Sequence, residues 1–310
     1  MTRAQPLPYR DPVFDGPTDP VVVRERDGAL VMLYTQRRAT VPGPGVAWVH
    51  GSHVGRAVSF DDGATWAYDG VLEGLRLAGD DPEMTFWAPA VVRMAGRWRL
   101  FVSVIRGIPD RWEGHERVIR DYATDDLRRG SLTGGGELVL SSRAVIDAAV
   151  ARCPDGLWRL WYKDEVHDST TWVAESVDGS SWRVAGCAIP GRPHEGPSVF
   201  PLGGWWWMLV DEWRGMGVYR STDGVAWTRQ GDEGAVILAE PGAHPLDRTV
   251  GRHGEVLVEG DSARLFYFTH PFWDGSEVAD AAARDARISA VHEARLEVVG
   301  DRLLCHRAPR

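Results

Sequence analysis

The chain has 310 residues, 25% of them charged, and a formal net charge of −9. This acidic balance argues against a broad phosphate-binding surface, so we expect no nucleic-acid partner. No apolar run approaches the roughly 18 residues of a membrane span, so we also expect no membrane partner.

The amino-terminal segment 1–12 lacks the roughly 7 to 15 consecutive apolar residues of a signal peptide, so we expect a cytoplasmic protein. Cys153, Cys187 and Cys305 are odd in number and widely spaced, which indicates neither a disulfide framework nor a zinc site. The 15 tryptophans and 35 glycines favour many short strands joined by tight turns, and therefore an all-β chain.

A β-rich unit recurs five times along the chain. Each copy is typical of a hairpin, with two apolar runs separated by a turn that contains glycine. The copies read TDPVVVRERDGALVMLYT from Thr18, WAPAVVRMAGRWRLFVSV from Trp87, IDAAVARCPDGLWRLWYK from Ile146, EGPSVFPLGGWWWMLVDE from Glu195 and HGEVLVEGDSARLFYFTH from His253. A supersecondary unit repeated in this way predicts stacked blades or coils, because no single copy can bury its own apolar face.

Three copies are followed by a second repeated motif, S-x-D-(x)-G-x-x-W, which ends at Trp66, Trp182 and Trp227. It resembles the Asp-box turn of β-propellers, in which Asp and Gly form a tight turn and the Trp packs over it. We interpret these residues as scaffold. Together the two repeats predict a single domain over 1–310: an all-β, five-bladed β-propeller of four-stranded antiparallel blades. We further expect the amino-terminal strand to complete the fifth blade and close the ring.

The first strand of each blade begins near the propeller axis, so polar residues at these starts converge on one pocket. They include Asp19, Asp147, Glu195 and His253. Three carboxyl groups close together cannot all ionise freely, so at least one pKa should be raised, as a general acid requires. Glycoside hydrolysis uses such an arrangement of acid and base.

Over its whole length the chain resembles the family 43 glycoside hydrolases. The motifs that carry the resemblance occur in blade order: Asp19-Pro20, Trp87-Ala88-Pro89, Ile146-Asp147, Glu195-Gly196-Pro197 and His253-Gly254. The resemblance implies an inverting mechanism on a small carbohydrate, with Asp19 as general base, Glu195 as general acid and Asp147 orienting Glu195 and keeping its pKa high. It also implies a Ca²⁺ ion on the propeller axis with His253 as its ligand.

For substrate binding we expect Trp87, Trp213, Arg38 and His253, because aromatic faces stack on sugar C–H surfaces and fixed donors read hydroxyl groups. The expected activity is exo-cleavage of a terminal sugar such as arabinofuranose, xylose or galactose from short oligosaccharides or glycosides. Two alternatives stay open. One is another five-bladed sugar enzyme, either of the anhydrogalactosidase type or a glycoside phosphorylase. A phosphorylase needs a basic phosphate pocket, and Arg37 and Arg38 are the hint of one. The other is a carbohydrate-binding propeller without catalysis.

Overall fold

The computed structural model describes residues 4–273 and 284–307, and within them it is almost entirely β-structure. The strands form five four-stranded antiparallel sheets, each built from four consecutive strands. Blade one has β1 (Pro17–Arg24), β2 (Leu30–Gln36), β3 (His53–Ser59) and β4 (Ala67–Val71); blade two has β5 (Met84–Met94), β6 (Arg97–Arg106), β7 (Val118–Thr124) and β8 (Thr133–Glu137). Blade three has β9 (Val145–Arg152), β10 (Trp158–Asp164), β11 (Thr170–Ser176) and β12 (Arg183–Ile189); blade four has β13 (Glu195–Leu202), β14 (Trp205–Asp211), β15 (Met216–Ser221) and β16 (Thr228–Arg229). Blade five has β17 (Arg252–Glu259), β18 (Ser262–Thr269), β19 (Ala290–Val299) and β20 (Arg302–Arg307), with the one-turn helix α1 (Arg284–Arg287) before β19.

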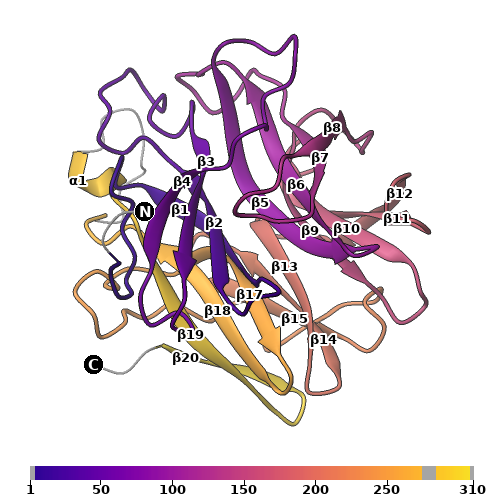
Figure 1. Ribbon diagram of the computed structural model, residues 1–310. Coiled ribbons are helices and arrows are strands. Elements are labelled where there is room, and N and C mark those ends of the chain that lie inside the picture. The colour runs from indigo at the N-terminus through magenta and orange to yellow at the C-terminus, as the bar shows by residue number, and fades with distance from the viewer. Residues whose placement is uncertain (1–3, 274–283, 308–310) are drawn as a thin grey trace.

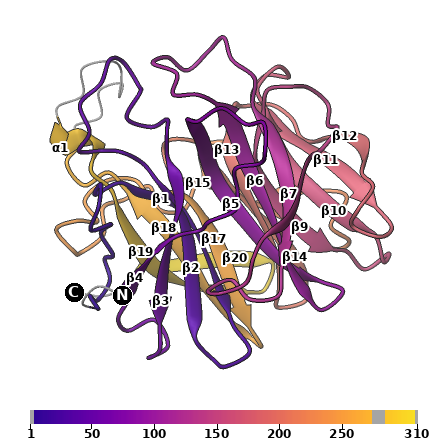
Figure 2. The same cartoon turned by 45° about the horizontal axis from the view of Figure 1, so that its top comes forward.

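The five sheets close into a ring. Their first strands contact one another in the order β1, β5, β9, β13 and β17, and β17 contacts β1 again. Figures 1 and 2 show the consequence, with the indigo amino-terminal blade beside the orange and yellow carboxy-terminal blade. The predicted five-bladed propeller with four-stranded antiparallel blades is therefore confirmed.

The expected closure by an amino-terminal strand is wrong. The fourth strand of blade five is β20, which pairs with β19 through the turn between Val299 and Arg302. Between residue 4 and β1 the described chain makes two isolated bridges, from Gln5 to Trp66 in blade one and from Tyr9 to Val291 in blade five. This segment therefore lies across the seam between first and last blade, and the prolines beside these residues prevent a continuous ladder.

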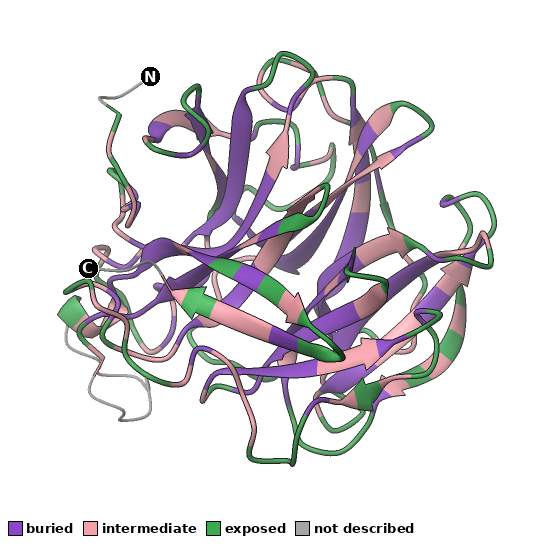
Figure 3. Ribbon diagram, turned by 90° about the horizontal axis from the view of Figure 1, so that it is seen from below, coloured by how far each residue is buried: buried purple, intermediate pink, exposed green. Residues whose placement is uncertain are grey.

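The Asp-box tryptophans hold neighbouring blades together. Trp66 stands edge-on to Phe266 of blade five at 6.1 Å between ring centroids, and Trp227 to Trp161 of blade three at 6.2 Å. Trp182 of blade three meets Phe101 of blade two in the same way. Each ring thus packs on the second strand of the preceding blade. Trp66 is fully buried, and truncating such an aromatic side chain costs roughly 3–5 kcal/mol, whereas Trp182 and Trp227 are only partly buried. Figure 3 shows the buried residues along the strands and the exposed ones at the turns.

None of the described segments forms a helix that is long and apolar enough to cross a membrane.

Candidate active site

The first strand of every blade carries a β-bulge or irregularity close to its start. The pairing register shifts after Thr18 in β1, Trp87 in β5 and Glu195 in β13, and shifts also occur in β9 and β17. Positive φ angles occur at these bulges: 50° at Asp19 and 59° at Asp147. Left-handed backbone costs a non-glycine residue roughly 1–2 kcal/mol, and such strain tends to be kept where it aims a side chain.

Side chains of neighbouring blades fix these bulges by accepting their amide hydrogens. Ser103 Oγ in β6 accepts from the Asp147 amide at 2.9 Å, and Thr35 Oγ1 in β2 accepts from the Ala88 amide at 2.8 Å. Asp211 in β14 accepts from the His253 amide at 3.0 Å. The second strand of one blade therefore positions the first strand of the next, which explains why buried polar residues recur at the ends of second strands.

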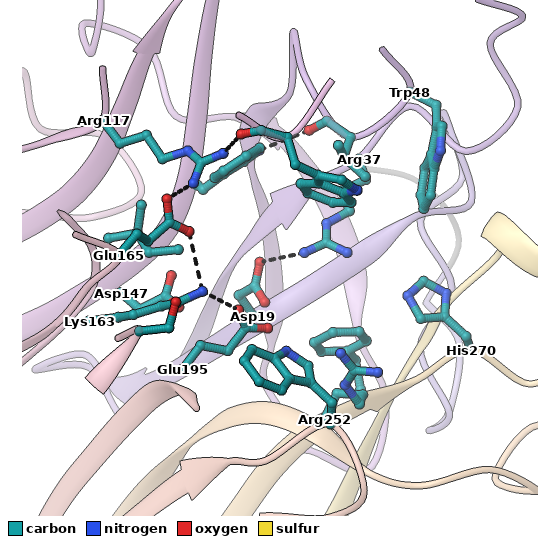
Figure 4. Close-up of a pocket in the computed structure, with 17 residues that line it drawn as sticks. Asp19, Arg37, Trp48, Arg117, Asp147, Lys163, Glu165, Glu195, Arg252 and His270 are labelled. Atoms are coloured by element: carbon teal, nitrogen blue, oxygen red, sulfur yellow. Dashed lines mark hydrogen bonds and ion pairs between the residues drawn. The ribbon is translucent and has the colours of Figure 1, made fainter. Parts of the chain in front are cut away.

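The starts of the first strands converge on a cavity of about 370 Å³. Its lining includes all three predicted catalytic carboxylates. The lining residues are Asp19, Arg37, Trp48, Val49, Trp87, Trp112, Arg117, Ile146, Asp147, Lys163, Glu165, Ser169, Glu195, Trp213, Arg252, Phe268 and His270. Figure 4 shows the carboxylates gathered at the centre of this group, with Trp48 and His270 at one side.

Asp19 is ionised. It lies 7% exposed, with Oδ1 at 3.4 Å from Nδ1 of His253 and Oδ2 at 3.7 Å from Nη2 of Arg37. Burial by itself would raise the pKa of Asp19, but the charges of Arg37 and His253 hold it well below its usual value. A permanently ionised carboxylate of this kind suits a general base.

Asp147 holds a proton more readily than an ordinary aspartate. Burial, reinforced by the charges of Glu195 and Asp19 and opposed by His253, raises the pKa of Asp147 to about 6. Its Oδ2 also accepts a hydrogen bond from the amide of Gly196 at 3.2 Å, which ties β9 to the start of β13.

Glu195 differs from the expectation drawn from the sequence. Its Oε2 lies 3.1 Å from Nζ of Lys163. Burial would raise the pKa of Glu195, yet Lys163, Arg252 and a hydrogen bond from Trp213 together lower it to about 2. Of these two carboxyl groups, therefore, Asp147 and not Glu195 has the raised pKa.

The residues expected to bind sugar fall into two groups. Trp87 and Trp213 line the cavity, the indole of Trp87 being fixed by a 2.8 Å hydrogen bond to the carbonyl of Val49. Arg38 is not among the lining residues, and its neighbour Arg37 is. Successive side chains of an extended segment point to opposite sides, so only one of two adjacent arginines can face the cavity.

His253 lies behind the cavity wall rather than in it, and its ring is engaged. Burial opposes its protonation, but the hydrogen bond with Asp19 and the charge of Asp147 raise the pKa of His253 to about 10. A metal ion could bind this imidazole only by displacing its proton. Within residues 4–273 and 284–307 no group of three or more His, Cys, Asp or Glu side chains could hold one. The residues present thus do not fit the expected Ca²⁺ site.

Three charged residues of the cavity were not found from the sequence: Arg117, Glu165 and Arg252. Glu165 lies two positions after Lys163 at the end of a second strand, so the alternation of a strand could have placed both on one side. Arg252 precedes the His-Gly motif directly. Arg117 directly precedes β7 of blade two, and no repeated motif marks its position.

No protein-family model matches the sequence, and no curated protein is similar to it in sequence. Solved structures are similar in fold over the whole chain. A thermostable family 43 glycoside hydrolase superimposes with a TM-score of 0.70 at 17% identity, covering 97% of this chain and 98% of its own. An exo-1,5-α-L-arabinanase from a bovine ruminal metagenomic library gives 0.66 at 15% identity, covering 97% and 100%.

A family 32 β-fructofuranosidase from Bombyx mori gives a TM-score of 0.68 at 14% identity, covering 99% of this chain and 65% of its own. A further family 43 neighbour is a β-xylosidase/α-arabinofuranosidase crystallised with xylotriose in a calcium-free form. At these identities the likeness establishes the fold, which is the five-bladed propeller that family 43 enzymes share.

Proposed function

We propose that the protein is an inverting glycoside hydrolase that removes a terminal sugar from short oligosaccharides or glycosides. The observation that carries the proposal is the meeting of Asp19, Asp147 and Glu195, from the starts of three first strands, in one cavity. Their environments separate their pKa values, which is the condition for assigning one carboxyl group as base and another group as proton source.

In the proposed mechanism Asp19 deprotonates a water molecule that attacks the anomeric carbon, and Glu195 protonates the leaving oxygen in the same step. Asp147 stores the proton that Glu195 needs. The fixed indoles of Trp87 and Trp213 provide apolar faces for sugar C–H surfaces, and Arg37 provides donors for hydroxyl groups.

Charge balance favours a neutral sugar. Four cationic residues line the cavity, and each has a carboxylate partner among the described residues: Arg37 with Asp19, Arg117 with Glu165, Lys163 with Glu195, and Arg252 with Asp211. A charged substrate would leave one of these groups uncompensated inside a partly buried site. We therefore propose neutral substrates such as arabinofuranosides, xylosides and galactosides, met in the cytoplasm.

The experiment is a screen of aryl xylopyranosides, arabinofuranosides and galactosides with the wild type and Glu195→Ala. An activated leaving group needs little help from a general acid, so we expect the variant to lose far more activity on a natural glycoside than on an aryl one. If no glycoside is turned over while sugars still bind, and bind equally to the variant, the protein is a carbohydrate-binding propeller and the proposal is wrong.

A glycoside phosphorylase is the second candidate, favoured by one observation. Nε of Arg37 is buried and has no hydrogen-bond partner among the described residues, although this side chain lines the cavity. An unpaired buried donor of this kind suits an anionic acceptor such as phosphate. Turnover that requires added inorganic phosphate and yields a sugar 1-phosphate would establish phosphorolysis, and turnover in phosphate-free buffer would establish hydrolysis.

A further inference from the structure

Lys163 is the only lysine in the chain, and it stands between two glutamates of the cavity wall. Its Nζ lies 3.1 Å from Oε2 of Glu195 and 3.2 Å from Oε1 of Glu165. The side chain is only 7% exposed. The ammonium group is therefore shared almost equally between two acceptors, as the dashed lines of Figure 4 show.

Glu165 is the anchored member of this pair. Its other oxygen is paired with Arg117, whose side chain is 6% exposed and donates a second hydrogen bond to the carbonyl of Trp112. Glu165 thus keeps a fixed position whichever way Lys163 leans. Lysine can lean, because its ammonium is a single point charge on a flexible four-carbon stem.

Charged groups around Glu195 determine whether its carboxyl group is protonated. While Lys163 remains paired with it, the pKa of Glu195 is about 2, after burial is offset chiefly by Lys163 and Arg252. A general acid in this state would carry no proton at neutral pH. The titratable and charged groups that influence Glu195 or are influenced by it are Lys163 of β10, Arg252 of β17, Asp147 of β9, the adjacent His194, and Arg117.

We propose that Lys163 is a movable counter-ion, which the structure holds between Glu195 and Glu165 and which pairs with Glu165 alone when a sugar is bound. One proton then leaves the carboxyl group of Asp147 and one arrives on Glu195, so the total charge of the site is unchanged. The Asp147 carboxylate that results faces protonated His253. Lys163 is therefore a positioning residue, and the inference rests on the proposed role of Glu195 as general acid.

The first test compares pH profiles of kcat for Glu165→Gln and Lys163→Met on the best aryl glycoside. Without Glu165 the ammonium has no second acceptor, so it stays with Glu195 and keeps that carboxylate ionised. We therefore expect the alkaline limb of the kcat profile to shift to lower pH by about one unit, which lowers kcat at pH 7 about tenfold. In Lys163→Met the ammonium is absent, so the pKa of Glu195 rises and the alkaline limb shifts to higher pH. Glu116→Gln, which removes an exposed partner of Arg143 outside the cavity, serves as the control and leaves the limb in place.

The second test uses the single lysine as a spectroscopic probe. Protein labelled with ¹⁵N at lysine Nζ gives one side-chain signal, from Lys163, which is followed while xylose, L-arabinose or galactose is added. We expect the signal to shift in the wild type as the sugar saturates, and not to shift in Glu165→Gln.

The outcomes separate the two claims. The movable counter-ion would be overturned if both variants lost activity equally at every pH, with the alkaline limbs in place. It would also be overturned if the Lys163 signal stayed unchanged while tryptophan fluorescence showed that sugar is bound. A wild type that turns over no glycoside would instead overturn the proposed function itself, whatever the lysine signal does.

Discussion

The pH dependence of hydrolysis follows from the one proton that Asp147 and Glu195 share. Burial raises the pKa of Asp147 to about 6, so the pair loses its proton near that pH. Above it the proton donor is missing, and kcat/KM should approach a tenfold fall per pH unit, which amounts to about 50-fold between pH 6 and pH 8. Arg37 and His253 keep the pKa of Asp19 below its usual range, so no acid limb is expected down to about pH 4.

Asp147→Asn isolates the contribution of the stored proton. Asparagine keeps the shape but holds no acidic proton, so Glu195 must supply it alone while Lys163 lowers the pKa of Glu195. We expect the alkaline limb to move down by at least one unit, with a loss of about 10- to 100-fold in kcat/KM at pH 5. The assay is initial rate on an aryl glycoside from pH 4 to 9.

Circular dichroism at each pH controls for unfolding. A profile that is flat between pH 6 and pH 8, or a limb that stays in place in Asp147→Asn, would refute the shared proton.

Two further predictions use matched pairs of variants. Gly196→Ala places a methyl group against the His253 ring at a residue with φ of 58°, whereas the methyl group of Gly260→Ala meets nothing within 4 Å at φ of 64°. In chemical denaturation we expect Gly196→Ala to lose about 3 kcal/mol of unfolding free energy and Gly260→Ala about 1 kcal/mol. Equal losses would contradict the contact with His253. Arg37→Ala should raise KM or abolish turnover, whereas Arg38→Ala should leave kcat and KM within about twofold, because only Arg37 lines the cavity. A larger loss in Arg38→Ala than in Arg37→Ala would support the original expectation that Arg38 binds sugar.

The repeated hairpins allowed the blades to be predicted because each copy carries its own turn and its own alternation. Closure of the ring depends on a different kind of information. The segment at 302–307 pairs with β19 across Gly300-Asp301, a two-residue hairpin turn that the sequence does contain, but a single short turn did not show that this pairing would prevail over one with the amino-terminal strand. Local pattern therefore predicts a blade better than it predicts which segments meet across the seam.

The candidate site, too, could be predicted from the sequence only in part. The carboxylates at the starts of the first strands could be placed from topology, since all five starts lie at one end of the axis. The charge relations could not, because they depend on contacts between blades. Lys163 of blade three lies beside Glu195 of blade four, and this contact reverses the expected direction of the Glu195 pKa. Arg117, which is paired with Glu165 beside Lys163, directly precedes β7 of blade two, where no repeated motif marks it.

The most direct test of the account is the rate and stereochemistry of hydrolysis by the wild type and Asp19→Asn, followed by ¹H NMR on the best glycoside of the screen. A general base is needed whatever the leaving group, so we expect the variant to lose at least about 100-fold in kcat on aryl and natural substrates alike. The wild type should release first the anomer opposite to that of the substrate. Undiminished hydrolysis by Asp19→Asn, or release of the retained anomer, would contradict the assignment of Asp19 as the base of an inverting glycosidase.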